Sequence, residues 1–223
     1  MHFGVGRGSA PQAAGMHAAA LKLLAPSFTI ARQRGSRDYR SHSSSMAHSD
    51  DLWIFAYGSL MWRPGFAYEE RQTVRVHGFH RALCVYSHIY RGTPERPGLV
   101  MGLDRGGSCL GVAFRVAPAT APTVLDYLRK RELITDVYNE KRLPVRLPGG
   151  RAVRALAYVA ERRHAQYAGR LSPGALLAMV RQGNGAAGSN ADYVRQTYQH
   201  LRSLGFDDAL LRWLNGELAA PGA

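Results

Sequence analysis

The chain contains a short segment whose backbone could bind an anion. Tyr57-Gly58-Ser59-Leu60 directly follows an apolar run that begins at Trp53. A glycine at the end of a strand lets the backbone turn sharply and approach a ligand closely. Successive amides beyond it can point into one concavity that holds a carboxylate or a developing oxyanion. On this local pattern alone, an ordinary turn at the end of a strand is the competing interpretation.

Glu132 is the candidate for proton transfer. Leu125, Leu128 and Glu132 recur at i, i+3 and i+7, which places the carboxylate on the apolar stripe of a predicted helix. Burial raises the pKa of a carboxyl group, and a raised pKa suits acid/base work near neutral pH. Three basic residues, ending with Arg131, directly precede it. An ion pair at the end of the helix is therefore the alternative.

A third feature is the segment RGTPERPG, residues 91–98, which has two prolines, two glycines and two arginines. Prolines and glycines constrain such a loop, and its guanidiniums could cover a site or hold an acidic substrate. A rigid connector without a role in chemistry is the alternative. His77, His80 and His88 lie in or beside predicted strands without ligand-like partners, so we expect them to be structural.

Other kinds of chemistry have no motif in this chain. Cys84 and Cys109 lie in apolar runs without the spacing of a zinc site, so we expect free, buried and inert thiols and no metal. Free thiols fit a cytoplasmic location, although two cysteines can also close one disulfide. GxxxxGK[ST] and GxSxG are both absent, so the P-loop and serine hydrolase interpretations are excluded.

Short strands in the first part of the chain and helices in the second part must position these residues. We expect strands at 53–57, 73–76, 82–86, 99–103, 109–116, 143–147 and 152–159, with turns at DRGGS and at Pro148-Gly149-Gly150. We expect helices at 122–133, 172–183 with its cap and terminating glycine, 190–204 and 207–218. This order predicts an α+β domain with a mostly antiparallel sheet or barrel against which the helices pack.

Composition and charge limit the possible partners. The 223 residues are 46% hydrophobic and 20% charged, which is typical of a globular protein of one large domain, or of one domain with a tail. The formal net charge is +13, of which residues 1–45 contribute +5. We expect no nucleic-acid partner because no basic stripe is interleaved with aromatic residues. We expect no membrane-spanning helix because no apolar run approaches about 18 residues.

The organised pattern begins near Trp53. We therefore expect residues 1–48 to be a disordered or non-native extension and residues 49–220 to form a single catalytic domain. The arginine- and serine-rich start is also compatible with a transit peptide. An upstream extension with Met46 as the working start is a further interpretation.

Four segments, in order, closely resemble the ChaC-type γ-glutamylcyclotransferases. They are FAYGSL at 55–60 followed by MWRPGF, RGTPERPGLVMGLDRGGSCLGVAFRV at 91–116, YLRKRE at 127–132, and GNGAAGSNADYVRQT at 183–197. The resemblance extends from about Trp53 to Leu214 and does not include the N-terminal segment. It implies a small mixed or antiparallel β-barrel with packed helices that converts glutathione to 5-oxoproline and cysteinylglycine without a cofactor.

The resemblance also assigns roles to residues. It implies that the Tyr57 to Leu60 turn holds the γ-glutamyl group through backbone amides and that Glu132 is the general acid/base, with Arg91 bordering the site. The substrate's own α-amine attacks the γ-carbonyl, so one carboxylate can accept a proton and later return it. The oxyanion needs donors, and turn amides, Tyr138 and Tyr193 are the unranked candidates.

Two other functions stay open at this point. One keeps the fold and the reaction but acts on other γ-glutamyl peptides or amines. The other is a non-enzymatic module that binds an acidic partner through its basic surface. The oligomeric state cannot be predicted from these residues.

Overall fold

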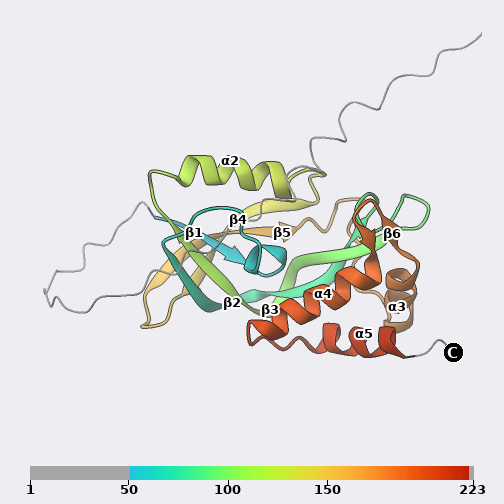
Figure 1. Ribbon diagram of the computed structural model, residues 1–223. Helices are drawn as coiled ribbons and strands as arrows, with labels where there is room; N and C mark the ends of the chain where they lie inside the picture. Colours follow the sequence, from blue (N-terminus) through green and yellow to red (C-terminus); the bar gives the residue numbers. More distant parts are fainter. Residues whose placement is uncertain (1–50, 221–223) are drawn as a thin grey trace, which may run out of the picture. The chain divides into compact units, whose positions relative to one another are not determined.

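The computed structural model describes residues 51–220 and shows a curled sheet against which helices pack (Figure 1). The expected extension, residues 1–48, and the alternative start Met46 lie outside the described residues. The elements are β1 (Leu52–Ala56), the 3₁₀ helix η1 (Ser59–Met61), β2 (Glu70–Ser87), β3 (Gly98–Val116), α2 (Ala121–Glu132), β4 (Tyr138–Arg146), β5 (Ala152–Ala160), α3 (Pro173–Gln182), β6 (Asn184–Gly185), β7 (Gly188–Ser189), α4 (Asn190–Ser203) and α5 (Ala209–Ala219).

The main sheet has five strands in the order β2-β3-β1-β5-β4. All neighbouring strands in it run antiparallel except β1 and β5, which are parallel through pairs such as Trp53 with Ala155. The sheet curls into a half barrel (Figure 1). The predicted α+β class, with a mixed and mostly antiparallel sheet, is confirmed.

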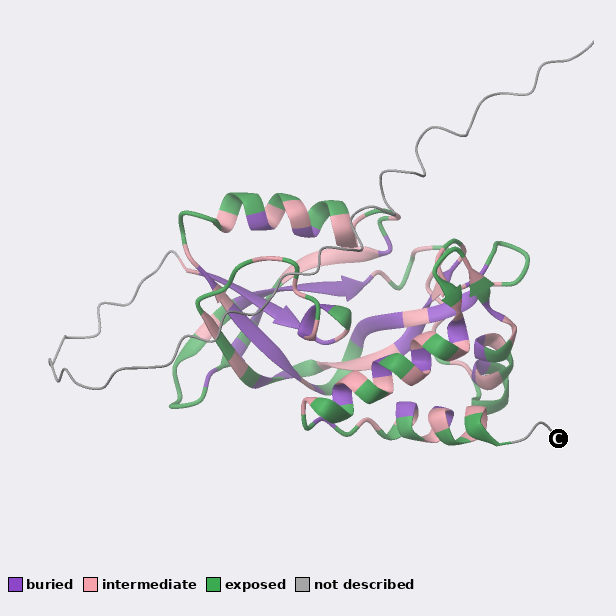
Figure 2. Ribbon diagram, viewed as in Figure 1, coloured by how far each residue is buried: buried purple, intermediate pink, exposed green. Residues whose placement is uncertain are grey.

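Strand β1 lies at the centre of the sheet and is buried along its whole length (Figure 2). Trp53 and Phe55 join one hydrophobic cluster with side chains of β4 and β5. Ile54, which points to the opposite face, joins a second cluster that includes the helices. A strand that is covered on both faces has apolar residues at successive positions, because no side chain faces solvent. This explains the sequence LWIFA.

The sequence prediction divided β2 and β3 into two strands each, and this was wrong. Each is one continuous strand, of 18 and 19 residues, and DRGGS lies within β3 instead of forming a turn. Gly78, Gly106 and Gly107 have φ values of 82°, 102° and 67°, which favour glycine. The register shifts at this point, so the glycines form a bulge that bends the ribbon and does not end it.

The helices lie in two places along the sheet (Figure 1). Helix α2 packs apart from α3, α4 and α5, which contact one another near the β2–β3 ribbon. Ser172 caps α3 by accepting from the Ala175 amide, as predicted, and Asp208 caps α5 by accepting from the Leu211 amide. Among the described residues, no helix is both long enough and apolar enough to cross a membrane.

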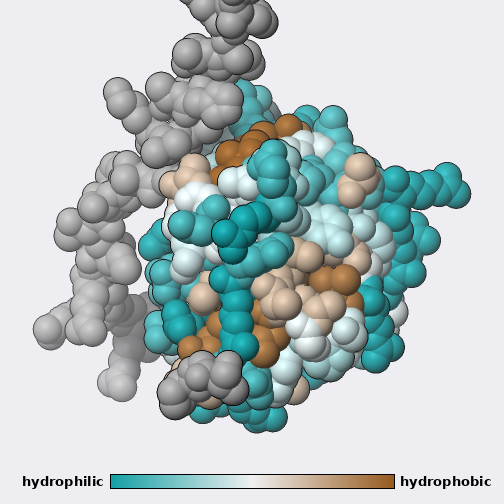
Figure 3. Space-filling view, turned by 90° about the vertical axis from the view of Figure 1, so that its right-hand side faces the viewer, coloured by the Kyte–Doolittle hydropathy of each residue, from teal (hydrophilic) through white to brown (hydrophobic). Residues whose placement is uncertain are grey.

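The surface near α3 is mixed in character. Seen from the side that faces right in Figure 1, its hydrophobic patches are interrupted by hydrophilic side chains (Figure 3). Large hydrophobic residues that stay exposed, among those described, are Tyr68, Ile89 and Ile134. Exposed apolar residues scattered singly are normal on a protein surface.

Candidate functional site

The Tyr57 to Leu60 segment forms the turn that leaves strand β1. The Met61 amide donates to the Gly58 carbonyl at 2.9 Å, and this bond closes the turn. Within residues 51–220, the amides of Gly58, Ser59 and Leu60 donate to no protein acceptor. Three successive amides without protein partners can bind a carboxylate or an oxyanion. Gly58 has a φ of −130°, so its conformation does not by itself require a glycine.

Glu132 is the last residue of α2, and its side chain is 19% exposed. It continues the inward stripe of Val124 and Leu128, so the predicted inward position is confirmed, whereas Leu125 is only half-buried. Burial raises the pKa of the Glu132 carboxyl, and the adjacent Arg131 guanidinium opposes this increase. A carboxylate in this setting can exchange a proton near neutral pH.

Arg131 joins Glu132 to the turn. Its Nε lies 3.0 Å from Glu132 Oε1, and one terminal nitrogen donates to Ser59 Oγ at 2.9 Å. The other terminal nitrogen donates to the Arg63 carbonyl at 2.8 Å and to the Tyr127 hydroxyl at 2.9 Å. The ion pair at the end of the helix, which was the alternative to a catalytic role for Glu132, is therefore present. It also holds the Glu132 carboxylate beside the turn.

Two tyrosines hold the backbone of Met101, a residue of β3 that sequence reasoning missed. The Tyr138 hydroxyl donates to the Met101 carbonyl at 2.8 Å, whereas the Tyr193 hydroxyl accepts from the Met101 amide at 3.1 Å. A Cβ on Gly58 would lie 3.9 Å from Met101 Cβ, so this pair lies beside the turn. Burial raises the pKa of both tyrosines; at Tyr193 the Met101 amide and the Arg91 guanidinium partly oppose this increase. Both phenols therefore stay protonated.

Tyr57 has a structural side chain. Its hydroxyl donates to the Tyr158 carbonyl at 2.9 Å inside the domain. Burial raises the pKa of the Tyr57 phenol well above its ordinary value, with Tyr138 and Glu132 adding to the increase. The phenol of Tyr57 is therefore not available to the candidate site, and Tyr57 takes part only through the peptide that it shares with Gly58.

Arg91 contacts Tyr193 and the β6–β7 hairpin. Its NH1 donates to the carbonyls of Ala187 and Ser189 at 2.6 and 3.3 Å. Its guanidinium lies 5.3 Å from the centre of the Tyr193 ring. Burial lowers the pKa of Arg91. Arg91 therefore borders the site through Tyr193, and its NH1 already donates to protein carbonyls.

Asn190 attaches the start of β3, directly after the 91–98 loop, to helix α4, and sequence reasoning noted it only as a helix start. Its Oδ1 accepts from the Leu99 amide and its Nδ2 donates to the Leu99 carbonyl, both at 2.7 Å. The side chain is fully buried and completes the hydrogen bonds of β3 as a neighbouring strand would. A Cβ on Gly183 would lie 2.7 Å from Gly98 Cα, so this close packing needs glycine.

The remaining candidates have structural contacts. Cys84 and Cys109 are free and buried, as predicted, and burial raises the pKa of Cys84 to about 12. His80 bonds to the Gly106 carbonyl, and His88 stacks on an aromatic ring of β2. Among the residues described, no group of three or more His, Cys, Asp or Glu side chains could hold a metal ion.

Comparisons with known proteins agree on one family. The family model described as ChaC-like protein matches residues 52–218. The chain is 36% identical over 157 residues to a glutathione-specific gamma-glutamylcyclotransferase of Escherichia coli (strain K12), over 70% of this chain and 68% of the relative. It is 34% identical over 148 residues to glutathione-specific gamma-glutamylcyclotransferase 1 of Homo sapiens, over 64% of this chain and 66% of that relative.

Solved structures agree in fold. The crystal structure of a yeast gamma-glutamyl cyclotransferase specific to glutathione matches with a TM-score of 0.66 at 22% identity, over 75% of this chain and 97% of that one. The bacterial and human relatives are covered over about two thirds of their own length.

Proposed function

The chain belongs to the ChaC-like protein family, and we propose that it converts glutathione to 5-oxoproline and cysteinylglycine by intramolecular cyclisation. It is then an enzyme, a lyase whose nucleophile and leaving group both belong to the substrate. The observation that carries the proposal is the mostly buried Glu132 carboxyl, held by Arg131 beside a turn with three amides that have no protein acceptor among the described residues.

The proposed reaction needs one proton acceptor. Glu132, as a carboxylate, takes a proton from the substrate's α-ammonium group, and the resulting amine attacks the γ-carbonyl to close a five-membered ring. The tetrahedral intermediate then collapses by breaking the bond to the cysteinyl nitrogen, to which Glu132 returns the proton. Glu132, again a carboxylate, takes the second proton that the ring nitrogen must lose to become the 5-oxoproline amide, and the released amine of cysteinylglycine accepts it as the product leaves. Orientation in a fixed turn supplies much of the rate enhancement because both reacting groups lie in one molecule.

Turn amides are the proposed donors to the γ-glutamyl group and to the oxyanion, and Tyr193 is the proposed additional donor. The Tyr193 hydroxyl accepts from the Met101 amide, so that bond does not use its proton. The Tyr138 proton is used in the bond to the Met101 carbonyl. The structure thus favours Tyr193 over Tyr138 for this role, with Arg91 holding the Tyr193 ring.

Phenylalanine at the two tyrosine positions should separate these roles. Tyr193→Phe should lower kcat about 100-fold, as expected for one lost oxyanion donor. Tyr138→Phe should lower kcat less than tenfold and cost about 1 kcal/mol of stability for one hydrogen bond. Steady-state kinetics with glutathione and urea denaturation measure both effects. A larger loss of kcat in Tyr138→Phe than in Tyr193→Phe would reverse the assignment.

The pH dependence of kcat should respond to Arg131. Activity needs ionised Glu132 at the start of the cycle, so kcat falls as the pH drops through the pKa of that carboxyl. Arg131 lowers this pKa against the effect of burial. Arg131→Gln should therefore move the acid limb of the profile to higher pH, and Arg131→Lys, which keeps the charge, should move it less. An acid limb that stays in place, or moves to lower pH, in Arg131→Gln would contradict the coupling.

The substrate range can be tested with a matched pair. Glutathione and γ-glutamyl-alanine share the γ-glutamyl group and differ in the leaving amine, which is cysteinylglycine in one and alanine in the other. We expect a clear preference for glutathione in kcat/KM, measured as release of 5-oxoproline. Equal or higher values for γ-glutamyl-alanine would instead favour a cyclotransferase of broader specificity.

The catalytic domain, the partners and the location of the reaction are part of the same proposal. We propose that residues 49–220 form the single catalytic domain and that glutathione is the only partner the reaction needs, with no cofactor and no nucleic acid. A cytoplasmic location is proposed because Cys84 and Cys109 are free thiols.

A further inference from the structure

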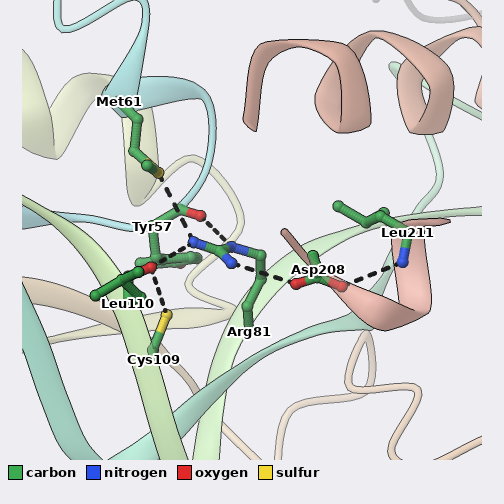
Figure 4. Close-up of polar contacts among 7 residues, drawn as sticks. All are labelled: Tyr57, Met61, Arg81, Cys109, Leu110, Asp208 and Leu211. Carbon is green, nitrogen blue, oxygen red and sulfur yellow. Dashed lines mark hydrogen bonds and ion pairs between the residues drawn. The ribbon is translucent and has the colours of Figure 1, made fainter. Parts of the chain in front are cut away.

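One buried arginine connects the turn of the candidate site to the last helix of the chain. Arg81 lies on β2, and its side chain is 7% exposed. Its Nε donates to the Tyr57 carbonyl at 2.5 Å, and NH2 donates to the Leu110 carbonyl at 2.8 Å (Figure 4). The same NH2 lies 3.8 Å from the sulfur of Met61, so one guanidinium contacts both ends of the segment from Tyr57 to Met61.

Asp208 holds this guanidinium from the other side. Its Oδ2 lies 3.2 Å from Arg81 NH1, and its Oδ1 accepts from the Leu211 amide at 3.1 Å as the cap of α5 (Figure 4). The Asp208 side chain is 14% exposed. Because the helix amide fixes one carboxylate oxygen, the other oxygen has a fixed direction toward Arg81.

The bond to the Tyr57 carbonyl determines the direction of the Gly58 amide. The carbonyl of Tyr57 and the N–H of Gly58 belong to one planar trans peptide, in which they point in opposite directions. Arg81 holds the carbonyl on its own side, so the N–H is directed away from Arg81. A cationic donor on the carbonyl also polarises the peptide and makes its N–H a stronger hydrogen-bond donor.

We propose that Arg81 and Asp208 are positioning residues that aim the Gly58 amide at the oxyanion formed on the γ-carbonyl of the substrate. This inference rests on the proposed function, and it adds two residues that do not touch the substrate. Asp208 orients Arg81, Arg81 orients the Tyr57–Gly58 peptide, and the peptide donates to the reacting oxygen.

Asparagine at position 208 separates this role from the capping of α5. Asparagine is as good a helix cap as aspartate, but it carries no charge for Arg81. Asp208→Asn in the full chain should lower kcat for glutathione about tenfold, with KM within about threefold and the melting temperature within a few degrees. The control is Asp207→Asn, because Asp207 is exposed and, within residues 51–220, pairs only with the surface residues Arg202 and Arg212. This control should leave kcat unchanged.

A pair of variants at Arg81 distinguishes positioning from stability. Arg81→Met should lower kcat about 100-fold and also lower the melting temperature, because it leaves Asp208 buried without its cationic partner. The double variant Arg81→Met/Asp208→Ser removes both charges and keeps a capping residue, so most of the melting temperature should return. Under the proposal, kcat of the double variant stays low although stability recovers.

Two results overturn the proposal in distinguishable ways. If wild type cyclises glutathione while Asp208→Asn and the double variant keep kcat within twofold of it, the positioning role is wrong and the proposed function stands. If wild type forms no 5-oxoproline from any γ-glutamyl substrate, the proposed function and the positioning role both fail.

Discussion

Replacing Glu132 with glutamine should lower kcat for glutathione at least about a thousandfold. The glutamine amide has nearly the same size and shape, but it cannot accept the proton of the α-ammonium group or return one to the leaving nitrogen. Burial raises the pKa of this carboxyl, so wild type can perform both transfers near neutral pH. Formation of 5-oxoproline, followed by mass spectrometry at saturating glutathione, measures the loss.

Two companion variants make the Glu132 result specific. Glu132→Asp keeps the charge but withdraws the carboxylate by about one methylene, so it should also be strongly impaired. Glu140→Gln is the matched control, because Glu140 of β4, whose side chain is 23% exposed, is in an ion pair with Arg129 and has a lowered pKa. This control should stay within about threefold of wild type. Near-normal turnover by Glu132→Gln, with the protein folded, would disprove the catalytic assignment.

Asn190→Ala should give the largest loss of stability among the proposed variants. The side chain satisfies both the amide and the carbonyl of Leu99 in a fully buried position. Alanine would leave two buried backbone groups unpaired, at about 1–3 kcal/mol each, so we expect the free energy of unfolding to fall by about 2–6 kcal/mol. Urea denaturation measures this change.

Activity should fall together with stability in Asn190→Ala. Asn190 begins α4, the helix that carries Tyr193 to the Met101 amide, so loosening this contact displaces a proposed oxyanion donor. The control is Asn184→Ala, at an exposed asparagine of β6, which should change stability by less than about 0.5 kcal/mol. Equal stability of the two variants would show that the Asn190 contacts do not hold the start of β3 to the helix.

The elements set by local pattern were predicted well. The spacing of Leu128 and Glu132 placed the carboxylate on the inward face, because a helical period fixes which residues share a face. Ser172 and Pro173 predicted the start of α3, because a serine N-cap followed by proline is typical of the first turn of a helix. The lengths of β2 and β3 were not predictable locally. A glycine pair such as Gly106-Gly107 suits both a turn and a bulge, and only the pairing strand distinguishes them.

The residues that organise the site come from distant parts of the chain. Arg81 bonds a carbonyl 24 positions away, and Asn190 bonds a backbone 91 positions away. Backbone acceptors carry no residue signature, so no spacing pattern indicates these contacts. A single clue was available for Arg81, which is a charged residue directly before the apolar run ALCVY and is costly to bury without partners. Met101 offered no such clue, because only its main chain takes part.

Product identification from the full chain and glutathione tests the central claim most directly. The claim is that the substrate's own α-amine displaces cysteinylglycine. Mass spectrometry should therefore find 5-oxoproline and cysteinylglycine in equal amounts, with no free glutamate. Glutathione with an acetylated α-amine should not react. Release of glutamate, or turnover of the acetylated substrate, would mean that water or a side chain is the nucleophile and would contradict the proposed mechanism.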